Sequence, residues 1–310
     1  MKKISTAHKL LFATTGIGVL IQLLMLNVAN YNILIMTFQM VISIPTLVYL
    51  FVTKQDISEV LRIKAISVPT VLFSILAAIL CYPIAALISV ISSYFIEGGL
   101  TDTMSMVYDA GLGFTLFAVA VLPALGEEIL FRGVLYNTYS KVSPRKGILL
   151  SAALFALMHM NFYQMFYAFF VGFVFALMME AADSLLVPML MHFVFNAVSV
   201  VNGYYVYSSS NVAAQAEMIV NEDLAMKAAL FNYTVTALVC AGILIVVIYV
   251  TYSINKRQMK LIFIKKPDVV TKDHLTDEPY PKAKWIDLWL ILFLLYAAVA
   301  IAYNTYLLIS

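Results

Sequence analysis

Apolar stretches of about 20 residues recur along this chain from Leu10 to Ile309, and they restrict its fold more than any other feature. A stretch of this length crosses the hydrocarbon core of a bilayer as an α-helix, because each helical residue adds 1.5 Å. Only 12% of the 310 residues are charged, against about 25% in a soluble domain. The sequence therefore predicts an all-α fold, a polytopic transmembrane helical bundle.

About nine spans can be placed between the polar segments. The fifth and sixth are short for lipid-exposed spans, so we expect them to be inner helices. The basic start is followed by an apolar run longer than that of a signal peptide, and we interpret it as a retained first helix. The predicted spans cover residues 10–29, 33–52, 68–95, 111–135, 147–160, 163–180, 184–202, 227–253 and 286–309.

The positions of Lys and Arg predict the orientation of the bundle. When the N-terminus is placed inside, all but two of the 19 basic residues fall in inner segments, the exceptions being Arg132 and Lys227. An odd number of spans then places the C-terminus outside. The outer segments instead carry acidic residues, namely Glu97, Asp102, Asp109, Glu217, Glu222 and Asp223.

Charge and cysteine content exclude some classes of protein. A net charge of +2 gives no reason to expect a nucleic-acid partner. Cys81 and Cys240 lie inside apolar runs without C-x-x-C spacing, so we interpret them as packing residues rather than as a disulfide or a metal site. The bilayer is the partner that composition predicts, and the oligomeric state is left open.

The fourth span contains GEEILFRGVLY, in which three ionisable residues lie where a membrane helix is usually apolar. Such residues are costly in a bilayer and often mark function. Glu128 and Arg132 are four residues apart, so they face each other and can pair. Glu127 is rotated by about 100° from Glu128 and points elsewhere. The pattern predicts that the Glu128 carboxylate is paired with Arg132 and that the Glu127 carboxylate is not.

Two further spans carry polar side chains at similar depth. FALMH puts Phe155 and His159 on one helix face, and HFVFN does the same for His192 and Asn196. Counted along the helices, all lie about 12–18 Å from the inner surface. We therefore expect one shared pocket that opens toward the cytosol.

Each of these side chains also has a structural interpretation. The Glu128–Arg132 pair can stabilise the bundle, a lone histidine can satisfy a carbonyl, Asn196 can join two helices and Phe155 can pack. Taken together, a carboxylate and an imidazole can activate water, while a second imidazole and an amide can stabilise an oxyanion. These are the groups that amide hydrolysis requires.

A metal ion is an alternative that the residues leave open. Glu127, His159 and His192 are types of side chain that bind zinc. The H-E-x-x-H pattern of zinc proteases is absent from the sequence, so the local signal for a metal is weak. We leave both a zinc site and a site without a cofactor as predictions.

At these residues the sequence resembles the CPBP family of intramembrane proteases, which includes type II CAAX prenyl endopeptidases and bacteriocin-processing or bacteriocin-immunity proteins. The motifs E-E-x-x-x-R, F-x-x-x-H and H-x-x-x-N follow in order over about residues 111–202. The resemblance implies a catalytic core at 111–202, with N-terminal transmembrane helices in 1–110. C-terminal transmembrane helices and a basic cytosolic linker, 254–284, would make up 203–310.

The resemblance also implies roles for the site residues. Glu127 would be the general base for water, aided by His159, while His192 and Asn196 would stabilise the oxyanion. Glu128, Arg132 and Phe155 would shape the site. The substrate would be a membrane-associated peptide, either a prenylated CAAX-type C-terminus or a bacterial leader or pheromone precursor. We expect a multi-pass protein of a bacterial cell membrane whose site faces the cytosol.

Two other functions remain open from the sequence. A non-catalytic membrane scaffold or bacteriocin immunity protein would use the same residues for stability alone. A proton-coupled transporter would use Glu and His as a relay, although no internal repeat typical of many transporters is visible. Cleavage of a peptide that depends on Glu127 and His159 distinguishes the protease from both.

Overall fold

The computed structural model describes residues 2–24, 31–53, 56–93, 101–213, 222–257, 259 and 285–309. Over these residues the chain forms helices and the turns between them, and no strand. The all-α prediction is confirmed. The longer helices are α1 (Lys2–Leu24), α2 (Tyr31–Val52), α4 (Val68–Ser93), α9 (Pro144–Met158), α10 (Phe162–Ala182), α11 (Leu186–Ala213), α12 (Glu222–Ile254) and α14 (Leu288–Ile309).

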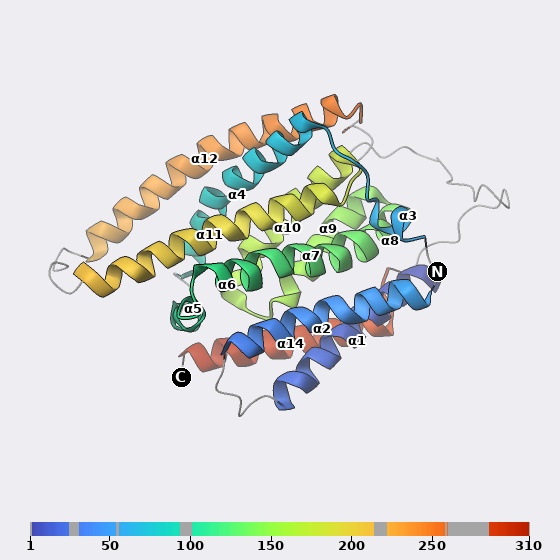
Figure 1. Ribbon diagram of the computed structural model, residues 1–310, viewed down its shortest axis with the longest axis horizontal. Helices are drawn as coiled ribbons and strands as arrows, with labels where there is room; N and C mark the ends of the chain where they lie inside the picture. Colours follow the sequence, from blue (N-terminus) through green and yellow to red (C-terminus); the bar gives the residue numbers. More distant parts are fainter. Residues whose placement is uncertain are drawn as a thin grey trace.

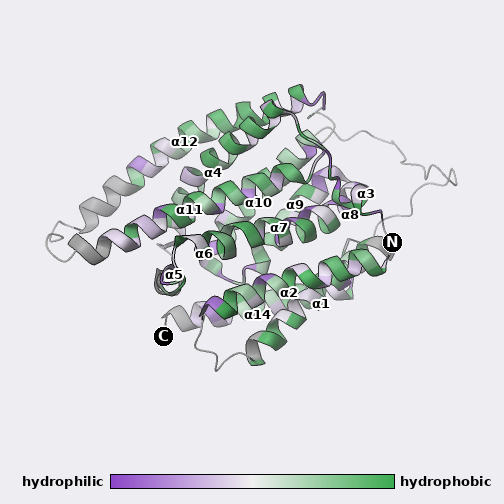
Figure 2. Ribbon diagram, in the orientation of Figure 1, coloured by the Kyte–Doolittle hydropathy of each residue, from purple (hydrophilic) through white to green (hydrophobic). Residues whose placement is uncertain are grey.

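Eight helical segments of the described chain are long and apolar enough to cross a membrane. In Figure 2 apolar residues extend along α4 and α12, whereas polar residues gather near α3 (Ile57–Leu61). The chain is an integral, multi-pass membrane protein. The orientation of its termini relative to the cytosol stays a prediction, as does the division into three regions, and most of linker 254–284 lies outside the described residues.

The fifth predicted span, 147–160, forms a helix that is too short to cross a bilayer. This helix, α9, has 15 residues and a length of about 22 Å, against about 30 Å for the hydrocarbon core. It ends because Met160 adopts a left-handed conformation with φ of 49°, after which the side chain of Asn161 caps α10. Eight described segments thus have the length and apolar character of a span, close to the nine that the sequence predicted.

The helical segment from Leu112 to Ser140 changes its winding along its length. Ordinary α-turns in α6 (Leu112–Leu116), α7 (Leu122–Glu128) and α8 (Asn137–Ser140) alternate with wider π-turns. The π-turns form η1 (Phe117–Val121) and η2 (Ile129–Tyr136). Turns of this kind are rare in proteins, but those that occur often lie at functional sites. The two glutamates of the first motif lie at the junction between α7 and η2.

The helices pack in groups around this segment. On one side α1 packs against α2 and α14, and α2 also contacts α7. On the other side α4 packs against α10, α11 and α12. Figure 1 shows the N-terminus at the end of the molecule near α3 and α8, and the C-terminus at the opposite end. The central segment is thus enclosed by helices from both ends of the chain.

Candidate active site

Glu127 and Glu128 are neighbours in sequence, but the helix turns them toward different surroundings. Glu128 is fully buried, and its Oε1 accepts a hydrogen bond from Nη1 of Arg132 at 3.0 Å. The same oxygen lies 2.7 Å from Nδ1 of His192. Glu127 is 7% exposed and lines a cavity instead. The predicted Glu128–Arg132 pair is present, and Glu127 is the carboxylate that remains outside it.

Arg132 is a fully buried cation that connects three helices. Besides its pair with Glu128, its Nη2 donates to the carbonyl of Gly172 on α10 at 3.0 Å. Its guanidinium carbon lies 4.5 Å from the ring centre of Phe155 on α9. A guanidinium suits this position because its planar fork can donate in two directions while its face rests on an aromatic ring. Arg132 therefore fixes the glutamate segment against α9 and α10.

Both predicted histidines use Nδ1 for a structural hydrogen bond. Nδ1 of His192 faces the Glu128 carboxylate, as described above. Nδ1 of His159 lies 2.9 Å from the carbonyl oxygen of Phe155. A carbonyl only accepts, so His159 carries its proton on Nδ1, and its Nε2 has a free lone pair when the ring is neutral. Both rings line the cavity.

Phe155 packs against both histidine rings, and the amide of Asn196 is held by a backbone carbonyl. The Phe155 ring meets His159 edge-to-face with centroids 5.0 Å apart, and it meets His192 in the same manner at 5.9 Å. Asn196 donates from Nδ2 to the carbonyl of Val119 in η1 at 2.8 Å. That bond uses one of two amide hydrogens. The first π-turn, η1, thus supplies the partner for Asn196, and η2 begins directly after the two glutamates.

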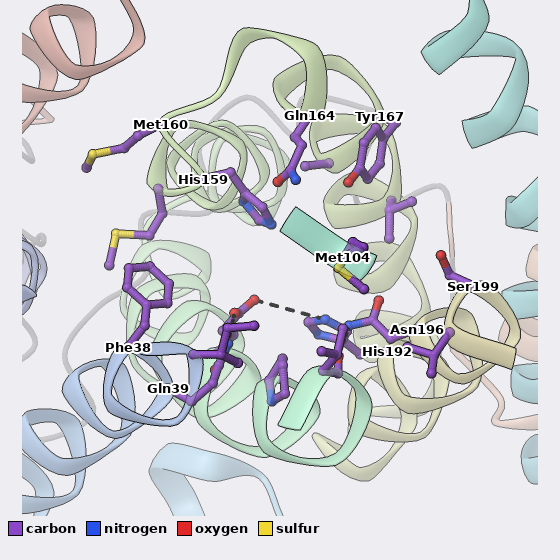
Figure 3. A pocket seen from close by; sticks show the side chains of 18 of the residues that line it. Phe38, Gln39, Met104, His159, Met160, Gln164, Tyr167, His192, Asn196 and Ser199 are labelled. Carbon is purple, nitrogen blue, oxygen red and sulfur yellow. Dashed lines mark hydrogen bonds and ion pairs between the residues drawn. The ribbon is translucent and has the colours of Figure 1, made fainter. Parts of the chain in front are cut away.

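The cavity has a volume of about 1090 Å³ and is lined mainly by apolar side chains of α1, α2, α4, α10 and α11. Five of the predicted site residues line it: Glu127, Phe155, His159, His192 and Asn196. Glu128 and Arg132 lie behind them. Figure 3 shows His159, Gln164 and Tyr167 across the opening from Gln39 and His192. A mostly apolar cavity with a few converging polar groups is typical of a binding site for an organic ligand.

The closest approach of a carboxylate and an imidazole across this cavity is between Glu127 and His192. Oε2 of Glu127 lies 4.0 Å from Nε2 of His192, drawn as a dashed line in Figure 3. This separation exceeds a direct hydrogen bond. A single water molecule can contact both atoms, since 4.0 Å is less than two hydrogen bonds of about 2.8 Å.

Sequence reasoning missed Gln39 on α2, which also faces Glu127. Nε2 of Gln39 lies 3.5 Å from Oε1 of Glu127. The available signal was an amide side chain inside the otherwise apolar run 33–52.

The zinc site that the sequence left open at Glu127, His159 and His192 stays a prediction. Among the residues that the structure describes, no three His, Cys, Asp or Glu side chains are grouped so as to hold a metal ion.

A comparison with protein families matches residues 109–198 to the type II CAAX prenyl endopeptidase Rce1-like family. The matched segment contains all seven residues that carry the three motifs, from Glu127 to Asn196. The predicted resemblance to the CPBP family is confirmed over this segment. Searches of curated proteins and of solved structures found no match.

Proposed function

We propose that this multi-pass membrane protein with an Rce1-like segment is an intramembrane endopeptidase that hydrolyses a peptide bond of a membrane-associated peptide. The observation that carries the proposal is the 4.0 Å gap between Oε2 of Glu127 and Nε2 of His192. A water held there has a carboxylate on one side to take its proton. It also has an imidazole on the other side, near where a substrate carbonyl would lie.

In the first step, the water oxygen attacks the carbonyl carbon of the scissile peptide bond while Glu127 takes one proton. A C–O bond forms, and the electron pair of the carbonyl moves onto its oxygen to give an oxyanion. In the second step the C–N bond breaks, and the leaving nitrogen receives the proton from Glu127. His159, with Nε2 as an acceptor, assists the removal of the water proton in the first step from across the cavity.

The buried residues support an oxyanion-stabilising role for His192 and Asn196. A carboxylate bonded to Nδ1 of a histidine stabilises the doubly protonated ring, as in other catalytic His–carboxylate pairs. Glu128 stands in that position, so Nε2–H of His192 can donate to the oxyanion. One amide hydrogen of Asn196 donates to the carbonyl of Val119, so the second amide hydrogen can donate to the oxyanion.

The character of the cavity supports an apolar or lipid-modified substrate. A prenylated CAAX-type C-terminus and a bacterial leader or pheromone precursor both meet this description. The uneven distribution of Lys and Arg supports a site that faces the cytosol, and we propose that the membrane is that of a bacterial cell. None of these steps uses a metal ion, and cleavage in the presence and absence of a chelator tests that choice.

The test is cleavage of quenched fluorescent peptides by the purified full-length protein. Glu127→Gln keeps the shape of the side chain but removes its base, so we expect the rate to fall at least about 10³-fold. His159→Ala should lose about 10²-fold or more. Both variants should insert and unfold like the wild type. Unchanged cleavage by both would reject the proposal, as would substrate flux into liposomes without peptide-bond cleavage.

A further inference from the structure

Helix α2 brings a glutamine to the carboxylate that the proposed reaction uses. Gln39 is only 8% exposed and lines the same cavity, although it lies outside the matched segment 109–198. Its Nε2 is 3.5 Å from Oε1 of Glu127, the long end of the range for a hydrogen bond. Such contacts are often long without substrate and shorten in the working complex. Gln39 therefore lies where it can act on the carboxylate that the proposed reaction uses.

The close packing of α2 against α7 explains how Gln39 reaches Glu127. At Gly126 an added Cβ would lie 2.0 Å from Oγ of Ser43, so with Ser43 in this rotamer the approach requires glycine. Ser43 is one helical turn after Gln39 and donates from Oγ to the Gln39 carbonyl at 2.8 Å. The same face of α2 thus makes two contacts with consecutive residues of α7. The contact of Ser43 with Gly126 permits the close approach of the helices, and the contact of Gln39 reaches the carboxylate of Glu127.

The two oxygens of Glu127 face different partners because of this arrangement. Oε1 faces Gln39, and Oε2 faces Nε2 of His192 across the cavity. A donor on one oxygen fixes the rotation of the carboxylate, which decides where the other oxygen points. Oε1 of Gln39 is buried without a hydrogen-bond partner among the described residues, so it can accept from a bound water or a peptide N–H.

We propose that Gln39 is a positioning residue, whose amide holds Glu127 so that Oε2 is directed at the water between Glu127 and His192. This inference rests on the proposed function, since it assigns Gln39 a part in the same hydrolysis. It also extends the active site beyond the matched segment to the second helix of the chain.

Steady-state kinetics of Gln39→Leu, a change of similar size without donor or acceptor, tests the role in the reaction. We expect kcat to fall about 10-fold or more, because the base is misdirected in the transition state, while KM stays within about two-fold. Thr46→Val is the matched control on the same helix, since the Thr46 hydroxyl bonds only to the backbone of Ile42 in the described structure. This control should leave kcat and KM unchanged.

The dependence of kcat/KM on pH gives a readout that a purely structural role would not move. Because Gln39→Leu removes the donor that faces Oε1 of Glu127, its profile should differ in shape from that of the wild type, whereas Thr46→Val should leave the profile unchanged. The profile reports on the whole cluster rather than on one group. The titratable or charged groups around Glu127 are His159, Tyr167 and His192 on other helices, and Glu128 and Arg132 on its own segment.

A double-mutant cycle on thermal unfolding tests the contact without requiring activity. We expect the shift in unfolding temperature of Gln39→Leu with Glu127→Leu to differ by about 1–2 °C or more from the sum of the single shifts. Additive shifts would overturn the proposal, as would wild-type kcat and pH profile in Gln39→Leu. If the wild type cleaves no peptide, the proposed function fails, while a coupled cycle still establishes the Gln39–Glu127 contact.

Discussion

At the scale of single residues, Arg132 separates the roles of the two glutamates. It is fully buried and pairs with Glu128, which leaves Glu127 as the carboxylate at the cavity. A buried ion pair adds little net stability, but removing one partner leaves a buried charge uncompensated, at a cost of about 3–5 kcal/mol. We therefore expect Arg132→Met to lower the free energy of unfolding by about 3 kcal/mol, measured by denaturant or thermal unfolding in detergent.

A second substitution identifies the cause of that loss. In Arg132→Met with Glu128→Gln, neither charge remains, and the amide oxygen can still accept from His192. The double variant should therefore recover part of the stability that Arg132→Met loses. If it is as unstable as Arg132→Met, the orphaned charge is not the reason, and lost packing against Phe155 would explain the effect instead.

At the scale of the helices, Gly126 controls the distance between α2 and α7. In Gly126→Ala the new methyl group would meet Oγ of Ser43 at 2.0 Å, so either the Ser43 side chain rotates and loses its bond to the Gln39 carbonyl, or α2 shifts and Gln39 with it. We expect cleavage to fall about 10-fold, because small displacements of catalytic groups are costly. Adding Ser43→Ala removes the clashing oxygen and leaves a 3.2 Å contact to the Ser43 Cβ, which a small shift relieves. The double variant should recover most of the activity.

The same substitution elsewhere controls for a general effect of alanine in a helix. Around Gly16 on α1, nothing lies within 4 Å of an added Cβ. Gly16→Ala should therefore leave peptide cleavage unchanged. Equal losses in Gly16→Ala and Gly126→Ala would show that the close approach to Ser43 is not what matters.

At the scale of the whole molecule, the sequence predicts the helices better than their exact extents. Apolar runs locate the spans, because burial in lipid requires continuous apolar length. They do not reveal that α9 stops short, since that depends on the left-handed Met160 and on the cap at Asn161. The motif residues could be found because charge in a bilayer is conspicuous. Gln39 and the π-turns could not, because an uncharged amide and a change of winding leave little trace in hydropathy.

Charged residues from distant parts of the chain meet at the end of the molecule near α3. Nη1 of Arg62 lies 3.3 Å from both Oε2 of Glu180 and Oδ1 of Asp183. Lys64 also pairs with Asp183, and Nη2 of Arg257 lies 2.7 Å from Oε1 of Glu180. The cluster joins α3, the end of α10 and the end of α12. It therefore ties the helices that frame the cavity to the outer layer of the bundle.

Asp183 allows the contribution of this cluster to be measured through pH. Burial favours a raised pKa for Asp183, but the hydrogen bond from Lys64 and the charges of Arg257, Arg62 and Lys64 outweigh it and hold the pKa below its usual value. A carboxyl whose pKa is lowered by folding stabilises the fold above the pKa of the unfolded chain. That contribution is lost as the pH falls through the lower, folded-state pKa. The loss should therefore occur below the ordinary pKa of an aspartate, about 4, as the pH falls further.

Asp183→Asn isolates the charge, because asparagine tolerates the left-handed conformation of residue 183, which has φ of 53°. At pH 7 we expect this variant to be less stable than the wild type by about 1 kcal/mol, the scale of a partly exposed ion pair. The difference should shrink toward zero as the pH falls further below about 4, the ordinary pKa of an aspartate. Unfolding midpoints of both proteins, measured in detergent across this range, check the expectation. A difference that persists unchanged at low pH would mean that hydrogen bonding or packing, rather than charge, holds these helices together.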